Sequence, residues 1–120
     1  MPEKHSLGKW GEDAACQFLE MCGYECLERR FRRPGGEIDL IFVKDSMVVF
    51  VEVKTRGPRC TIPPEVWATP RQLARLRRMA RIWLAEHHDP SWRGYRFDVV
   101  AISYGGNEGG SELRHLVGVG

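Results

Sequence analysis

The sequence lacks a long hydrophobic run and a paired-cysteine motif. Its longest uninterrupted apolar segment, residues 47–51, is far too short to span a bilayer. The polar residues 1–9 do not resemble a secretory signal peptide. None of the four cysteines forms a Cys-x-x-Cys pair, and no histidine lies at zinc-ligand spacing from them. We therefore expect a reduced, cytoplasmic protein with no membrane segment, no disulfide framework and no structural zinc.

The composition also gives no sign of disorder. Apolar residues make up 42% and charged residues 28% of the chain, which is ordinary for a globular protein. A chain of 120 residues buries enough surface to form a core without disulfides or a structural metal. The sequence predicts one domain over residues 1–120.

The net charge of +2 is small, but acidic and basic residues are segregated. Residues 66–85 contain five arginines and no acid, and residues 29–33 contain four arginines around Phe31. Such basic segments favour an anionic partner, of which nucleic acid is the commonest. The alternative is a solvated basic surface without a partner. The arginines of the first segment are Arg71, Arg75, Arg77, Arg78 and Arg81.

Hydrophobic periodicity predicts two helices and several short strands. Ser6 can cap the first helix and Gly23 can end it, while Thr69-Pro70 is a typical start for the second. The predicted order α-β-β-β-α-β is an α/β fold with a mixed central sheet flanked by helices, in which a crossover brings the fourth strand parallel to the third. The predicted elements are a helix over 7–22, strands over 24–31, 37–43 and 47–55, an irregular loop over 56–65, a helix over 70–87, a strand over 95–103 and an edge strand over 113–119.

Charged residues interrupt two otherwise apolar strands. Glu52 and Lys54 follow the apolar run 47–51 and point to the same face, since they are two residues apart. Asp39 lies between Ile38 and Leu40. If these strands pair as an antiparallel hairpin, Asp39 comes close to Glu52. Burying unpaired charges is costly, so the three side chains need either mutual pairing or a cleft.

Two converging carboxylates favour a hard divalent cation, Mg²⁺ or Mn²⁺. With Lys54 beside them, they provide the parts for phosphodiester hydrolysis. The alternative interpretation is a structural ion-pair network among Asp39, Glu52 and Lys54.

Residues 35–41 and 49–56 resemble the YraN family of bacterial proteins. That family is predicted to be nuclease-like and is distantly similar to archaeal Holliday-junction resolvases of the PD-(D/E)xK superfamily. The resemblance extends over most of the chain and implies a restriction-endonuclease-like fold. Further matching segments lie within residues 7–15, 23–24, 75–84 and 96–100.

The resemblance also implies roles for individual residues. Asp39 and Glu52 would be metal ligands, Lys54 the catalytic lysine, and Glu12 the acidic residue that completes the metal site, with Gly8 and Gly11 allowing a close approach of its helix. The chain departs from the family's pattern at two positions. Gln72 stands where a lysine is usual, and Arg30 where an asparagine is usual.

These observations lead to two competing hypotheses. The first is a Mg²⁺-dependent endonuclease acting on DNA, branched or otherwise structured, and the resemblance to resolvases implies a homodimer. The second is a non-catalytic nucleic-acid-binding protein built on a nuclease fold, which Gln72 favours. In either case the residues expected to contact nucleic acid are Arg30, Arg32, Arg56, Arg71, Gln72, Arg75 and Arg78.

Overall fold

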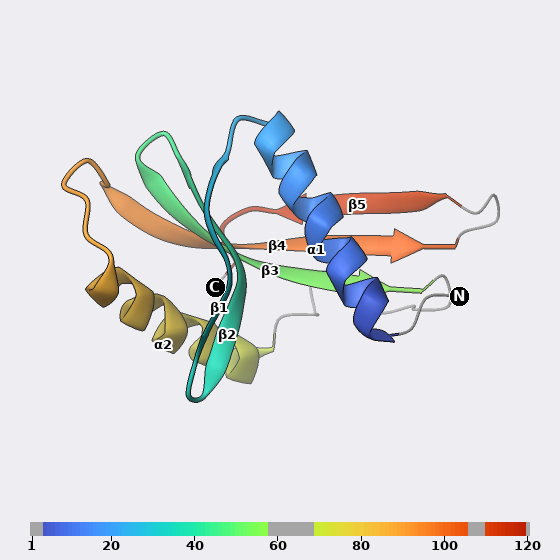
Figure 1. The fold of residues 1–120 in the computed structure, drawn as a ribbon, viewed down its shortest axis with the longest axis horizontal. Coiled ribbons are helices and arrows are strands. Elements are labelled where there is room, and N and C mark those ends of the chain that lie inside the picture. Colours follow the sequence, from blue (N-terminus) through green and yellow to red (C-terminus); the bar gives the residue numbers. More distant parts are fainter. Residues whose placement is uncertain (1–3, 58–68, 106–109, 120) are drawn as a thin grey trace.

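Among the residues that the structure describes, two helices lie on opposite faces of a five-stranded sheet (Figure 1). The computed structural model describes residues 4–57, 69–105 and 110–119. No helix among these residues is both long and apolar enough to cross a membrane. The elements are α1 (Lys4–Met21), β1 (Glu25–Arg33), β2 (Gly36–Lys44), β3 (Met47–Arg56), α2 (Pro70–Glu86), β4 (Gly94–Tyr104) and β5 (Ser111–Leu116).

The strands follow the chain order β1-β2-β3-β4-β5 across the sheet. Neighbouring strands are antiparallel except β3 and β4, which are parallel because α2 lies between them in the chain. The predicted α-β-β-β-α-β core and its mixed sheet are therefore confirmed. The predicted loop over 56–65 falls mostly outside the described residues, which stop at Gly57 and resume at Thr69.

The first helix ends where the sequence predicts, but it begins earlier than the predicted start at residue 7. Gly23 adopts a φ of +92°, and its N–H donates to the carbonyl of Glu20 while the N–H of Tyr24 donates to that of Leu19. This pair of bonds closes a helix through a left-handed residue, which glycine adopts at low cost. At the other end α1 begins at Lys4, so the predicted cap at Ser6 is wrong. Neither Lys4 nor the following histidine disfavours a helix enough to delay its start.

The second helix has a complete N-terminal cap. The side chain of Thr69 accepts a hydrogen bond from the N–H of Gln72, and the side chain of Gln72 accepts one from the N–H of Thr69. Pro70 occupies the first turn, where its missing N–H is harmless. The buried stripe of α2 is Leu76, Met79, Ala80 and Trp83, and Leu73 and Leu84 beside it are half-buried.

Strand β3 separates two hydrophobic cores. Val48 and Phe50 pack in the core beneath α2, and Val49 and Val51 pack in the core beneath α1. This alternation continues along the strand, so the side chains of residues 52 and 54 lie on the α2 side. The face on which the charged residues of β3 emerge is thus set by the apolar residues that precede them.

Helix α1 approaches β3 closely at one glycine. A Cβ atom on Gly11 would overlap the hydroxyl of Thr55, so only glycine allows this packing. Gly8, predicted to have the same role, faces open space: among the described residues, nothing beyond its own helix comes within 4 Å of where a Cβ atom would stand. One of the two glycines therefore sets the distance between α1 and the sheet.

A buried aspartate anchors the end of the sheet. The carboxylate of Asp98 on β4 is fully buried and accepts hydrogen bonds from Arg96 Nε (3.0 Å), His115 Nε2 (2.7 Å) and the N–H of Gly118 (3.0 Å). Burial alone would raise the pKa of Asp98, but these bonds outweigh it and hold that pKa below its ordinary value. The network joins β4 to β5 and to the residues after it.

We expect Asp98→Asn to lower the free energy of unfolding at pH 7 by about 3 kcal/mol, because it removes the charge that His115 and Arg96 surround. The loss should shrink as the pH falls through the lowered pKa of Asp98, since the wild-type carboxylate then becomes neutral too. Urea unfolding at several pH values measures both effects. Asp45→Asn, in an exposed turn with φ +52°, is the control and should change little.

Candidate active site

Strands β2 and β3 stop pairing at Leu40, the neighbour of Asp39. Their paired positions run from Lys44–Met47 to Leu40–Val51. Beyond Leu40, the Asp39 carboxylate accepts a hydrogen bond from the N–H of Val53 (Oδ2 to N, 2.8 Å). A side chain thus takes the place that a backbone carbonyl holds elsewhere in the ladder. This fixes Asp39 beside the part of β3 that carries Glu52, as the hairpin register predicts.

The two carboxylates share a poorly solvated region. Asp39 is 8% exposed. Burial and the nearby negative charge of Glu52 raise the pKa of Asp39 to about 8, although the bond from Val53 opposes the rise. Burial also raises the pKa of Glu52, against the effect of the positive charge of Lys54. The structure therefore holds together two carboxyl groups that resist ionising side by side.

Lys54 lies next to this pair. Its Nζ is 3.3 Å from Oε1 of Glu52, and its side chain is only 12% exposed. The predicted grouping of Asp39, Glu52 and Lys54 is thus present in the structure. The alternative interpretation was a structural ion-pair network among these three residues. The ion pair between Lys54 and Glu52 agrees with that interpretation for two of them.

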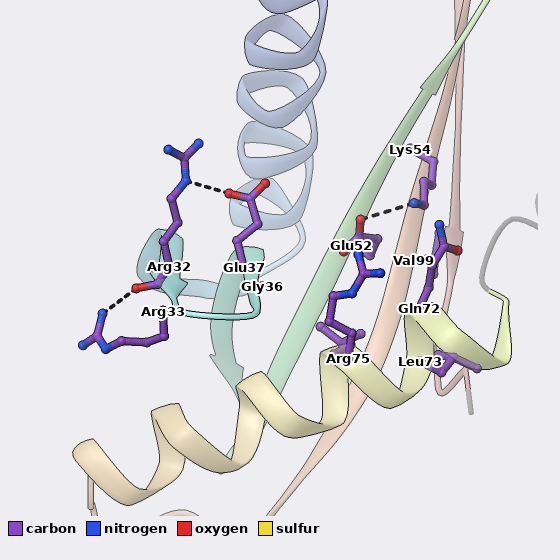
Figure 2. Close-up of a pocket in the computed structure, with 11 residues that line it drawn as sticks. Arg32, Arg33, Gly36, Glu37, Glu52, Lys54, Gln72, Leu73, Arg75 and Val99 are labelled. Atoms are coloured by element: carbon purple, nitrogen blue, oxygen red, sulfur yellow. Dashed lines mark hydrogen bonds and ion pairs between the residues drawn. The ribbon is translucent and has the colours of Figure 1, made fainter.

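A cleft of about 410 Å³ opens over Glu52 and Lys54. Its other walls are α2 and the tip of the β1–β2 hairpin (Figure 2). Gln72 and Arg75 rise from α2 toward the charged residues of β3 (Figure 2). Arg75 lies near enough for its charge to lower the pKa of Glu52. The cleft therefore holds positive charge from two different elements beside the half-buried carboxyl group of Glu52.

The hairpin tip contributes further charged residues. Arg32 lines the cleft and pairs with Glu37 (Nε to Oε2, 2.7 Å). Arg78, which we expected to contact nucleic acid, donates to the carbonyl of Gly35 at 2.8 Å and so ties the hairpin to α2. Arg33 lines the cleft and pairs with Glu86 of α2. It belongs to the basic segment 29–33, whose arginines indicated an anionic partner, although it was not among the individual residues expected to contact nucleic acid.

Glu12 does not line the cleft but pairs with Arg30, whose Nε lies 2.8 Å from its Oε1. Arg30 has a left-handed φ of +54° within β1, a conformation that costs a non-glycine residue about 1 kcal/mol and that asparagine tolerates better. This explains physically why an asparagine suits that position. The charge of Glu12 still contributes to the raised pKa of Asp39.

The remaining predicted residues lie around the same region. Arg56, at the end of β3, donates to the carbonyl of Thr55, and Arg71 is exposed in the first turn of α2. Within residues 4–57, 69–105 and 110–119, no three histidine, cysteine, aspartate or glutamate side chains are grouped to hold a metal ion. A metal site completed by Glu12 therefore stays a prediction.

Comparison with known proteins identifies the family. The model of the Uncharacterised protein family UPF0102 matches residues 11–102. The chain belongs to this family. A UPF0102 protein of Beutenbergia cavernae is 44% identical over 120 residues, covering 100% of both chains. One from Syntrophomonas wolfei is 40% identical over 111 residues, covering 92% of this chain and 94% of the relative.

The UPF0102 family is the YraN family that the motifs resemble, so that prediction is confirmed. A further UPF0102 protein, from Roseiflexus castenholzii, is 46% identical over 99 residues, covering 82% of this chain and 80% of the relative. The family match, over residues 11–102, includes all the residues that line the cleft. The name of the family states no activity.

Asp39→Asn is expected to stabilise the protein at pH 8 in the presence of EDTA. The pKa of Asp39 is raised to about 8 in the folded state, so the wild type loses stability as the pH rises from about 4 to about 8. Asparagine keeps an oxygen for the N–H of Val53 and carries no charge. Melting temperatures of both proteins between pH 4 and pH 8 measure the difference.

The gain should become small near pH 4, close to the ordinary pKa of 3.8 that Asp39 has in the unfolded state, and should disappear below that pH, where Asp39 is protonated in both states. Asp13→Asn is the matched control, because its pKa is lowered by hydrogen bonds from Arg29 and Lys9. That variant should not gain stability at pH 8. A melting temperature of Asp39→Asn below that of the wild type at pH 8 would contradict the assigned environment.

Gln72→Lys is expected to lower the free energy of unfolding by about 1 kcal/mol, because an ammonium group cannot accept the hydrogen bond from the N–H of Thr69. Gln72→Glu keeps the acceptor and places a negative charge at the helix N-terminus, so it should be at least as stable as the wild type. Urea unfolding at pH 7 compares the three proteins. Equal stability of the two variants would show that this cap contributes nothing.

Proposed function

We propose that this protein is a divalent-metal-dependent endonuclease that hydrolyses phosphodiester bonds in DNA. The observation that carries the proposal is the placement of the buried Asp39 close to the half-buried Glu52, two carboxyl groups of raised pKa, where Glu52 and Lys54 line a cleft. A purely structural role gives no reason to bring two like charges together in a poorly solvated place. Strongly shifted carboxyl groups in a cleft are typical of sites that bind a cation or perform acid–base chemistry.

Asp39 and Glu52 would hold the cation, Mg²⁺ or Mn²⁺. Their oxygen atoms are the ligands that these hard ions prefer, and a bound cation offsets the repulsion that raises both pKa values. When bound, such an ion polarises a phosphate oxygen and makes water a stronger nucleophile at neutral pH. The fit rests on two carboxylates only, so other ligands would come from solvent and from the substrate phosphate.

Lys54 and Arg75 would act on the substrate. Lys54 lies 3.3 Å from Glu52 and can donate to the scissile phosphate or to the attacking water. Arg75 lines the cleft from α2 and can bind a phosphate oxygen through its guanidinium group. A lysine is usual at position 72, and Gln72 carries no charge. Arg75, one turn further along α2, would supply the positive charge instead. The amide oxygen of Gln72 is already occupied in the helix cap.

The rim of the cleft would position a DNA backbone. Arg32 lies on the hairpin side of the cleft, and Arg71 is exposed on α2. Contacts from arginine to phosphate fix the orientation of a nucleic acid but do not read its sequence. We therefore propose that the enzyme selects DNA by shape, branched or otherwise structured, in line with the resemblance to junction resolvases. A homodimer acting on paired strands belongs to the same proposal.

Two observations favour a second candidate, a nucleic-acid-binding protein without turnover. Glu12, which would complete the metal site, pairs with Arg30, and Gln72 is used in the cap of α2. In that case the basic rim binds nucleic acid, and Asp39 and Glu52 take no part in cleavage. The two candidates differ only in whether a divalent cation causes cleavage.

The wild type with MgCl2 or MnCl2 is expected to cleave members of a panel of linear, flapped and four-way-junction DNAs. Glu52→Gln should reduce the rate at least about a hundredfold, because it removes a ligand charge while keeping the shape of the side chain. In the same proteins, MgCl2 should raise the melting temperature of the wild type but not that of Glu52→Gln. Gel assays and thermal melts give two independent measurements.

Glu25→Gln is the control variant, since this exposed residue lies at the start of β1, at the far end of the hairpin from the cleft. It should cleave like the wild type and show the same response to MgCl2. Tight DNA binding by both Glu52→Gln and the wild type, with no cleavage by either, would replace the nuclease by the second candidate. Absence of any DNA binding would refute both.

A further inference from the structure

Trp10 is an exposed aromatic residue on α1. Its side chain is 40% exposed, and the other large hydrophobic residues exposed in the described ranges are Met21, Tyr95 and Val117. Its ring meets that of Tyr104 edge to face, with centroids 6.4 Å apart and an angle of 73° between the planes. An edge-to-face contact fixes one ring against the other while leaving ring surface open to a ligand. The structure thus presents a fixed indole surface to solvent.

This aromatic pair lies at the end of the sheet where the cleft lies. Trp10 precedes Gly11, which packs directly against Thr55 of β3, and the hydroxyl of Tyr104 lies 3.5 Å from the Cβ position of Gly57. Thr55 follows Lys54 and faces the opposite side of the sheet. In Figure 1, the first turns of α1 lie near the ends of β3 and β4. The pair and the cleft therefore lie toward the same end of β3, on opposite faces of the sheet.

Positive charge continues along β3 toward the end of the strand where the aromatic pair lies. Lys54 lines the cleft, and Arg56 follows it at the end of β3. A polyanionic strand that enters the cleft and continues past these residues would reach the α1 side beside Trp10. Aromatic side chains beside a cationic path are typical of proteins that bind single strands, because any base can stack on them. A base inside a duplex has both faces covered by its neighbours and cannot do so.

We propose that Trp10, held by Tyr104, stacks on an unpaired base of the nucleic acid strand bound in the cleft. This inference rests on the proposed function and adds the class of substrate: a DNA with at least one unpaired nucleotide adjoining the bound phosphate. A flap, a gap or a single-stranded end provides such a base, whereas a blunt duplex does not. Tyr104 acts by positioning the indole ring.

The test measures binding in the Glu52→Gln background with EDTA, so that no cleavage interferes. The probes are a fluorescently labelled oligothymidylate of about twelve nucleotides and a blunt duplex of the same length. Trp10→Ala should weaken binding of the single strand at least about fivefold and change duplex binding less than about twofold. Trp10→Phe should lie between Trp10→Ala and the parent, because its smaller ring still stacks.

Tryptophan fluorescence provides a second measurement and a matched control. The single strand should quench the parent protein and the Trp92→Phe variant, because Trp92 stacks on Trp83 at the opposite end of α2. Quenching should be lost in Trp10→Phe. Melting temperatures confirm that each variant is folded, and the Phe variant preserves an aromatic ring if the Ala variant does not fold.

The outcomes separate this inference from the proposed function. Equal binding of the single strand by the parent and by folded Trp10→Phe and Trp10→Ala, with quenching retained, would overturn the role of Trp10 and leave the nuclease proposal intact. Loss of stability in Trp10→Ala without any change in affinity would assign the residue to packing and overturn the inference too. Failure of the parent to bind the single strand would also overturn the inference, whereas the nuclease proposal depends on the cleavage of the flapped and four-way-junction DNAs.

Discussion

The hydrogen bond from the Val53 N–H to the Asp39 carboxylate is the interaction on which the candidate site depends. Each backbone donor in a buried sheet needs an acceptor, and here the acceptor is a side chain because the β2–β3 ladder ends at Leu40. The bond holds Asp39 where its charge meets that of Glu52. The fold thus fixes the position of a carboxyl group whose charged form is disfavoured by burial.

The surrounding charges divide into those that build the cleft and those that face it. Arg33 and Arg78 are engaged in holding the hairpin against α2, through Glu86 and the carbonyl of Gly35. Arg75 and Lys54 face the space between these elements and affect Glu52 electrostatically. A cluster of arginines in the sequence therefore contains both structural and candidate functional residues, and only the tertiary contacts tell them apart.

Much of the fold and part of the site could be predicted from the sequence. The strand order and the proximity of Asp39 to Glu52 follow from two-residue alternation and from a short turn between two apolar strands, which are local properties. The pairing of Glu12 with Arg30 and the left-handed backbone of Arg30 could not be predicted, because they depend on how α1 meets β1. The role of Gln72 in the helix cap could have been predicted, because it lies three residues after Thr69, as in a capping box. It was not predicted, because position 72 was considered only as a site of contact with nucleic acid.

The partition of the sheet by β3 has an evolutionary consequence. Because the α1 core and the α2 core contact different side chains of the same strand, substitutions in one core need not be compensated in the other. The α2 side, which forms the cleft wall, can therefore diversify its surface while the α1 side preserves the stability of the molecule. A lineage can in this way alter the lining of the cleft on one face of the sheet without rebuilding the other.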